Sequence, residues 1–176
     1  MKKIVFFITL YLLPLFIGAQ SVENKEINPF TGGSISATSW SNIDGKYLLP
    51  NKGNSTFYFM LRKEDNTVFF HLKIYNRNIN RINKDSQLQL KMRDGSLITL
   101  TAIDTFIANT DVYTNLGDSY SRNIIHVVYR GDLSGLIGNN LIERISIDTI
   151  WGVLISELNE KNAKKVNKAY NLIMEN

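Results

Sequence analysis

Apolar residues recur at every second position through the middle of this chain, which is the period of a strand with one buried face. Residues 56–63 carry phenylalanine and leucine at alternate positions, and residues 67–75 carry valine, phenylalanine, leucine and isoleucine in the same way. A polar turn at 64–66 separates the two runs. Two alternating runs around a short polar turn predict a β-hairpin.

A second hairpin is predicted around the dipeptide Asp94-Gly95, because glycine tolerates the positive φ that tight turns require. Its arms are residues 87–93 and 96–103, and in the first arm leucine and methionine alternate with glutamine, lysine and arginine. The polar positions indicate that one side of this sheet meets water. Residues 122–130 and 141–150 are rich in β-branched residues and predict two further strands.

Near the C-terminus the period of the pattern changes from two to about 3.6. Apolar residues from Leu158 to Ile173 fall at spacings of three and four, and lysines occupy the opposite face. This predicts an amphipathic helix over about 159–174, with Asn159 as its N-cap. A basic amphipathic helix can also lie on a membrane surface, but packing against the sheet with solvated lysines is the favoured interpretation.

These elements predict a mainly β protein, an antiparallel sandwich or open barrel of six to seven strands with a C-terminal amphipathic helix. A small closed barrel with space for a hydrophobic ligand is the alternative architecture.

The first nineteen residues have the pattern of a secretory signal peptide. Lys2 and Lys3 precede an apolar run that extends to Ile17, and small residues follow before Gln20. We predict cleavage after residue 19, a flexible lead-in over 20–33 and a single β-rich domain over 34–176. An uncleaved membrane anchor is the alternative, although the apolar run is shorter than a bilayer requires. The expected location is therefore periplasmic or extracellular, with no stable membrane anchor after cleavage.

Composition narrows the range of functions further. Loss of the two lysines in the signal segment lowers the formal net charge from +4 to +2, which gives no electrostatic reason to expect a nucleic-acid partner. The chain has no cysteine, which excludes disulfides, thiolate metal sites and cysteine nucleophiles. No serine-hydrolase, phosphate-binding, dinucleotide-binding or His-Glu-x-x-His motif occurs. We predict no catalytic residue and no cofactor, and a role without catalysis is favoured.

Two groups of residues carry weaker chemical signals. His71 and His126 both lie opposite the apolar stripe of their strands, and neighbouring strands would let the two rings bind a metal together with a carboxylate. Asp104, Asp111 and Asp118 recur every seven residues in a polar stretch, which is compatible with calcium ligands or with paired glycosidase carboxylates. Sheet histidines without a metal and ordinary loop acids are the favoured interpretations, so no metal site is predicted.

Aromatic residues provide the candidate binding site. Tyr113 and Tyr120 belong to the same polar stretch and are the predicted ligand-binding residues, because exposed aromatic rings stack on sugars and anchor protein interfaces. Trp40 and Trp151 are expected in the core.

The hairpin Lys91-Met92-Arg93-Asp94-Gly95 and the later strand from Ile145 to Thr149 form a Lys-x-x-Asp-Gly and Ile-x-Ile-x-Thr pattern. In this pattern the chain resembles small exported β-domains of unassigned function from Gram-negative bacteria, over about half of its length after the signal segment. The resemblance implies no activity. Our hypothesis is an exported non-catalytic module that binds an envelope protein or glycan. A barrel-type carrier of a small apolar ligand and a carboxylate-based hydrolase are the alternatives.

Overall fold

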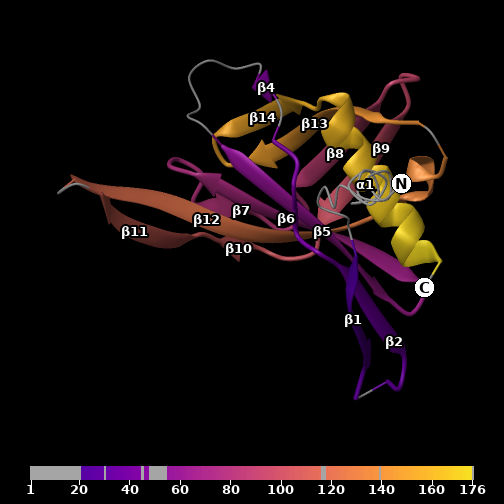
Figure 1. The fold of residues 1–176 in the computed structure, drawn as a ribbon. Helices are drawn as coiled ribbons and strands as arrows, with labels where there is room; N and C mark the ends of the chain where they lie inside the picture. Colours follow the sequence, from indigo (N-terminus) through magenta and orange to yellow (C-terminus); the bar gives the residue numbers. More distant parts are fainter. Residues whose placement is uncertain are drawn as a thin grey trace, which may run out of the picture.

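The computed structural model describes residues 21–29, 31–44, 46–47, 55–115, 118–138 and 140–175. The predicted signal peptide, residues 1–19, lies outside the described residues. The described chain is an antiparallel β-structure with one helix near the C-terminus (Figure 1), which confirms the expected fold class.

The elements follow one another in this order: β1 (Val22–Ile27), β2 (Ser34–Thr38), β3 (Ser41–Asn42), β4 (Lys46–Tyr47), β5 (Thr56–Glu64), β6 (Thr67–Asn76), β7 (Arg81–Ile82), β8 (Gln87–Met92), β9 (Leu97–Ala102), β10 (Phe106–Ile107), β11 (Asn109–Asn115), β12 (Asp118–Arg130), the 3₁₀ turn η1 (Ser134–Leu136), β13 (Ile142–Thr149), β14 (Gly152–Glu157) and α1 (Glu160–Met174).

The described residues thus form more strands than the six to seven that the pattern predicts. Four of the additional strands, β3, β4, β7 and β10, are only two residues long. A two-residue strand contains no alternation that a sequence pattern can reveal. Its pairing is decided by the neighbouring strand and not by its own residues.

Twelve strands join in one sheet, whose main path runs β1-β2-β5-β6-β12-β9-β8-β13-β14-β4. β11 pairs with β12 beside this path, β3 pairs with β5, and β7 and β10 form a separate two-stranded ladder. The path is open, because its end strands β1 and β4 do not pair with each other among the described residues. Two hairpins, β1–β2 and β11–β12, project from the body as arms (Figure 1).

The two predicted hairpins are confirmed. β5 and β6 pair from Glu64 opposite Thr67 onward, and Asp65 in the turn has a φ of 53°. β8 and β9 pair from Lys91 opposite Leu97, and Gly95 adopts the positive φ of 88° that its position in the turn requires.

The alternation of apolar residues places one face of each long strand in a common core. The fully buried side chains on the three central strands, β5, β6 and β12, are Phe57, Phe59, Leu61, Phe70, Leu72, Ile74, Ile125, Val127 and Tyr129. Residues of β8, β9, β13 and α1 complete the same cluster. Each buried aliphatic or aromatic side chain stabilises the fold by about 1.5–3 kcal/mol relative to an exposed one.

Helix α1 packs on β2 and β5 through its apolar face, while Lys161, Lys164 and Lys168 are exposed. This arrangement agrees with the interpretation that the helix packs on the sheet. Two polar side chains of the helix also bind the β2–β5 connection. The Asn162 Nδ2 donates to the carbonyl of Asp44 at 2.6 Å, and the Lys165 Nζ donates to the carbonyl of Asn42 at 2.7 Å.

No helix in the described ranges combines the length and the apolar character that crossing a bilayer requires.

Two expectations need correction. Residues 22–27, expected in a flexible lead-in, form β1 and pair with β2. Their sequence is polar and does not alternate, and a backbone ladder needs neither property. Trp151, expected in the core, is 64% exposed, because it lies in the turn between β13 and β14, where side chains project away from the sheet.

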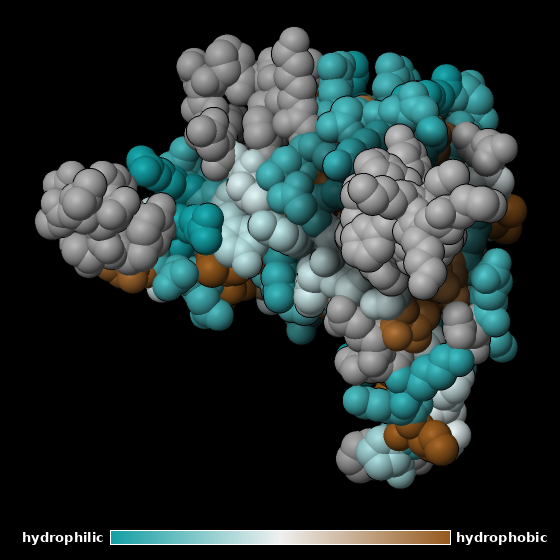
Figure 2. All heavy atoms as spheres, in the orientation of Figure 1, coloured by the Kyte–Doolittle hydropathy of each residue, from teal (hydrophilic) through white to brown (hydrophobic). Residues whose placement is uncertain are grey.

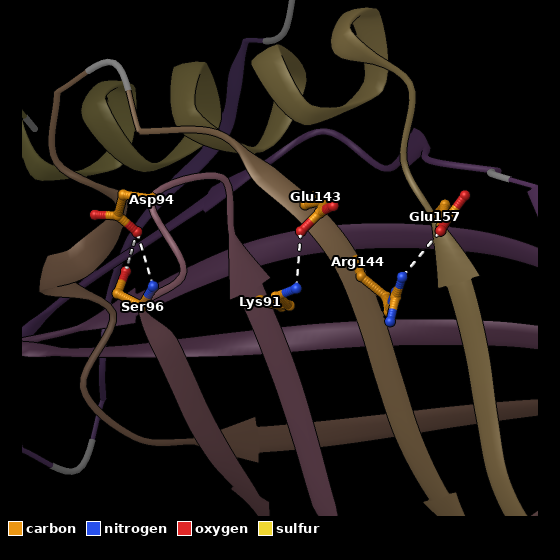
Figure 3. A network of polar contacts seen from close by, with 6 residues as sticks. All are labelled: Lys91, Asp94, Ser96, Glu143, Arg144 and Glu157. Carbon is orange, nitrogen blue, oxygen red and sulfur yellow. Dashed lines mark hydrogen bonds and ion pairs between the residues drawn. The ribbon is translucent and has the colours of Figure 1, made fainter.

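Ion pairs link neighbouring strands at one end of the sheet (Figure 3). Lys91 on β8 pairs with Glu143 on β13 at 3.2 Å, and Arg144 pairs with Glu157 on β14 at 3.0 Å. All four side chains are substantially exposed, so each pair adds little stability and mainly favours the observed register.

The N-cap of α1 offers a direct test of this local structure. The side chain of Asn159 accepts a hydrogen bond from the backbone N–H of Asn162 at 2.9 Å. We expect Asn159→Ala to lower the free energy of unfolding by about 1 kcal/mol, because it leaves that donor without its partner. Asn159→Asp retains an acceptor and should preserve stability. Urea denaturation of the two variants checks this, and equal losses would contradict the assignment of the cap.

Candidate functional site

The faces of β5, β6 and β12 that lie opposite the core carry a cluster of aromatic and basic side chains. We call it the aromatic–cationic face, and it consists of Trp40, Tyr58, His71, Lys73, Tyr75, Arg122 and His126. The same alternation that buries one set of residues places this set on the other side of the sheet. All of these residues except Trp40 come from the three central strands.

The register of the ladder sets the order of these residues along the sheet. Lys73 lies directly opposite His126 on one side and opposite Tyr58 on the other. His71 is two residues away on β6, opposite Val128. The two histidines are therefore diagonal neighbours across one strand pair, within reach of each other.

The two imidazole rings are in direct contact. The Nδ1 of His71 lies 3.0 Å from the Nε2 of His126, and the ring centroids are 5.2 Å apart. At this distance one ring donates an N–H to the other, and the tautomers decide which ring is the donor. The sequence indicated that the two rings could meet if their strands were neighbours, and β6 and β12 are indeed paired.

A metal site would require further ligands beside the two imidazoles. The described residues contain no group of three or more histidine, aspartate or glutamate side chains with the geometry to hold an ion. The charged groups that act on the histidines are the cations of Arg62 and Lys73. The positive charges of these two side chains oppose the binding of a metal cation at the pair.

Both histidines resist protonation. Burial, together with the smaller effects of the nearby His126 and Arg62, lowers the pKa of His71 from its ordinary value of 6.5 to about 4. Burial, followed by the charge of Lys73, also lowers the pKa of His126. Both rings are therefore neutral near pH 7, and each can donate and accept one hydrogen bond.

Trp40, in the connection that follows β2, packs against His126 and Lys73. The Nζ of Lys73 lies 4.0 Å from the centroid of the indole ring, and the His126 ring meets the indole edge-on at 5.2 Å. Trp40 is half-buried on the face opposite the core, so the expectation of a core tryptophan is wrong. No local pattern in the sequence connects Trp40 to residues on β6 and β12.

A second cation lies on an aromatic ring farther along the same face. The guanidinium carbon of Arg122 is 4.3 Å from the ring centroid of Tyr75, and Tyr58 meets Tyr75 edge-on at 5.5 Å. Contacts of this kind contribute about 0.5–2 kcal/mol each, depending on how far the cation is desolvated. They also hold the rings in defined orientations.

The two predicted ligand-binding residues belong to the β11–β12 arm. Tyr113 and Tyr120 are directly opposite each other in the ladder of this hairpin. β12 continues in unbroken register from the arm into the body, so positions 120, 122 and 126 belong to the same face of that strand. The side chains of both tyrosines lie outside what the structure describes, and their role stays a prediction.

The three regularly spaced aspartates occupy separate places. Asp104 follows β9 and accepts a hydrogen bond from the backbone N–H of Thr105, whereas Asp111 lies within β11 and Asp118 begins β12. In the ladder, Asp111 lies opposite Arg122. This polar stretch is therefore not one loop that gathers the three carboxylates: it contains β10, which pairs with β7, then β11, which pairs with β12, and the first residue of β12.

Two open hollows lie on either side of the C-terminal half of α1. One, of about 610 Å³, is lined by Lys164, Asn167, Lys168, Asn171 and Glu175 together with apolar residues. The other, of about 340 Å³, is lined by Arg130, Asp132 and Tyr170 among others. Neither hollow includes a residue of the aromatic–cationic face.

No protein-family model matches the chain, and searches among curated proteins and among solved structures give no significant match.

The buried histidine predicts how stability depends on pH. Above pH 6.5 His71 is neutral in both the folded and the unfolded chain, but between pH 6.5 and 4 only the unfolded chain binds the proton. Stability should therefore decrease as the pH falls through this window, by about 3 kcal/mol from this residue.

Urea denaturation at pH 7.5 and at pH 4.5 measures this effect. The His71→Gln variant cannot titrate at this position, so its stability should fall by less than that of the natural chain. His126→Gln, at a more exposed position, should reduce the decrease only in part. A pH dependence that is identical in all three proteins would show that His71 is not the group responsible.

Proposed function

We propose that this protein is an exported, non-catalytic module that binds a glycan of the cell envelope through its aromatic–cationic face. The observation that carries the proposal is the pairing of cations with aromatic rings outside the core. Lys73 lies on the ring of Trp40 and Arg122 lies on the ring of Tyr75, on the same side of one sheet. Export is the expectation from residues 1–19.

The chemistry of this face suits a sugar ligand. Aromatic rings offer apolar surfaces that stack on sugar rings, and cations or neutral imidazoles hydrogen-bond to hydroxyl and carboxylate groups. The ring contacts of Lys73, Tyr58 and His126 hold the aromatic groups in place before any ligand arrives. Groups that are already ordered lose less conformational entropy on binding.

The two alternatives have less support. A carrier of an apolar ligand needs an internal cavity, whereas this sheet is open and the two hollows beside α1 lie at the helix surface. A carboxylate hydrolase needs two acidic groups that flank a substrate. Each of the two hollows is lined by one acidic residue, Glu175 in the larger and Asp132 in the smaller.

Substitution of Trp40 tests the proposed site. We expect Trp40→Ala to weaken glycan binding by about tenfold or more, because it removes the ring on which Lys73 packs. Trp151→Ala is the matched control, since Trp151 is an exposed tryptophan at a turn on another part of the sheet. Both variants are screened on a glycan array after circular dichroism has established that they are folded.

Equal binding by the Trp40→Ala and Trp151→Ala variants would refute this site. If a native pull-down from envelope extract captures one protein, and Trp40→Ala abolishes the capture, the ligand is a protein and not a glycan.

The arm is tested separately. If Tyr113 and Tyr120 extend the binding face onto the β11–β12 hairpin, the double variant Tyr113→Ala/Tyr120→Ala should bind the same glycan more weakly while remaining folded. Affinity measured by isothermal titration checks this expectation. Unchanged affinity in the folded double variant would confine the site to the body of the sheet.

A further inference from the structure

The edge strands of this sheet differ in how they are protected against pairing with another chain. An exposed edge presents unpaired backbone N–H and C=O groups, and proteins commonly limit this hazard with short strands, bulges or charged residues. The edge strands β3 and β4 are two residues long. β1 contains Glu23, Lys25 and Glu26, and its pairing with β2 shifts register near Val22.

Strand β11 has few of these features. It is seven residues long, Asn109–Asn115, and pairs only with β12 among the described residues. Its register with β12 contains no bulge, and its sequence contains no lysine, arginine or proline. Asp111 is its single charged residue. The other edge of the same arm, positions 118–122 of β12, carries Asp118 and Arg122.

The exposed surface of the arm is also apolar at defined positions. Val112 at the centre of β11 is 64% exposed, and Ile107 of β10, which precedes this arm and pairs with β7, is 74% exposed. In Figure 2 much of the coloured surface is hydrophilic or pale, and small hydrophobic patches occur on the projecting arms as well as at the right edge of the body. Isolated apolar residues on a surface are common, so these residues add to the argument only together with the open strand edge.

The sequence of β11 permits antiparallel pairing with a second copy of itself without placing like charges opposite each other. When two copies overlap over all seven residues, Val112 lies opposite Val112 of the second copy. Asp111 then lies opposite Tyr113, and Thr110 lies opposite Thr114. This register avoids the repulsion of two aspartates, which would face each other if the copies were centred on Asp111.

We propose that β11 is a dimerisation edge that pairs antiparallel with β11 of a second copy of this chain, centred on Val112. The twofold axis then passes between the two valines, and the contact is isologous. The backbone groups of the free edge become paired, and the exposed valines pack against each other. The two sheets join into one continuous sheet through their arms.

The size of the contact sets its expected strength. A seven-residue strand pair is smaller than the interface of a typical stable complex, so we expect a concentration-dependent equilibrium of monomer and dimer. The proposal is independent of the glycan-binding face, because the residues of the body can bind a ligand in either state.

Cysteine scanning tests the register directly, since the natural chain contains no cysteine. Opposed residues of an antiparallel pair have Cα atoms about 4.5–5.5 Å apart, within the range that a disulfide bridges. We expect Val112→Cys to form a covalent dimer under mild oxidation. Thr110→Cys is the matched control, because two copies of position 110 would be separated by four residues along the strands, about 14 Å.

Sedimentation equilibrium of the natural chain and of Val112→Lys provides the second measurement. The lysine places two like charges opposite each other at the centre of the contact, so this variant should remain monomeric while the natural chain dimerises. Circular dichroism establishes that the variant is folded. A natural chain that remains monomeric up to about 1 mM would overturn the proposal. Equal cross-linking at positions 110 and 112, or an unchanged dimer in Val112→Lys, would do the same.

Discussion

The unbroken register between β6 and β12 is the constraint on which both faces of this protein depend. Eight consecutive residues of β12, from Asn123 to Arg130, pair with residues 69–76 of β6. Because side chains alternate between faces, a shift of one residue would exchange the two sets. The core would then receive His126 and lose Val127. The cost of burying imidazole and exposing valine therefore fixes the register, and with it the relative positions of the residues that β6 and β12 contribute to the aromatic–cationic face.

The same register brings the imidazole rings of His71 and His126 into contact, where protonation of either ring is energetically costly. His71 is 7% exposed although it lies opposite the core, and its imidazole meets that of His126 at 3.0 Å. Neutral rings satisfy each other by a hydrogen bond, whereas a proton on either ring would face nearby cations. Trp40 contacts the Lys73 cation and the exposed His126 ring, so a residue of the β2–β3 connection completes a surface that two distant strands begin.

The two projecting arms are more exposed than the body of the sheet and depend on the body for their stability. The β1–β2 and β11–β12 hairpins project beyond the body (Figure 1), and Val112 and Ile27 on their edge strands are largely exposed. An isolated hairpin is at best marginally stable in water. Here each arm is held because one of its strands continues into, or pairs with, the body of the sheet: β12 with β6, and β2 with β5. Such an arm contributes little to the core, and its surface is available for contacts with other molecules.

The sequence by itself determined the elements whose residues repeat with a clear period. Alternation located β5, β6, β8 and β9, and the change to a helical period located α1 together with its N-cap at Asn159. It also placed His71 and His126 on the polar side of their strands. These features depend on local periodicity and on the residues at turns, and both can be recognised within a short stretch of the sequence.

Only the tertiary structure decided the remaining features. β1, β3, β4, β7, β10 and β11 are polar or very short, and they become strands because a neighbouring strand offers a ladder of backbone hydrogen bonds. The contact of Trp40 with Lys73 and His126 joins residues that are 33 or more positions apart, and no pattern within either segment encodes it. The open edge of β11 likewise exists only because the order of strands leaves nothing beside it among the described residues. Pairing between distant segments is a property of the whole chain, and local sequence cannot express it.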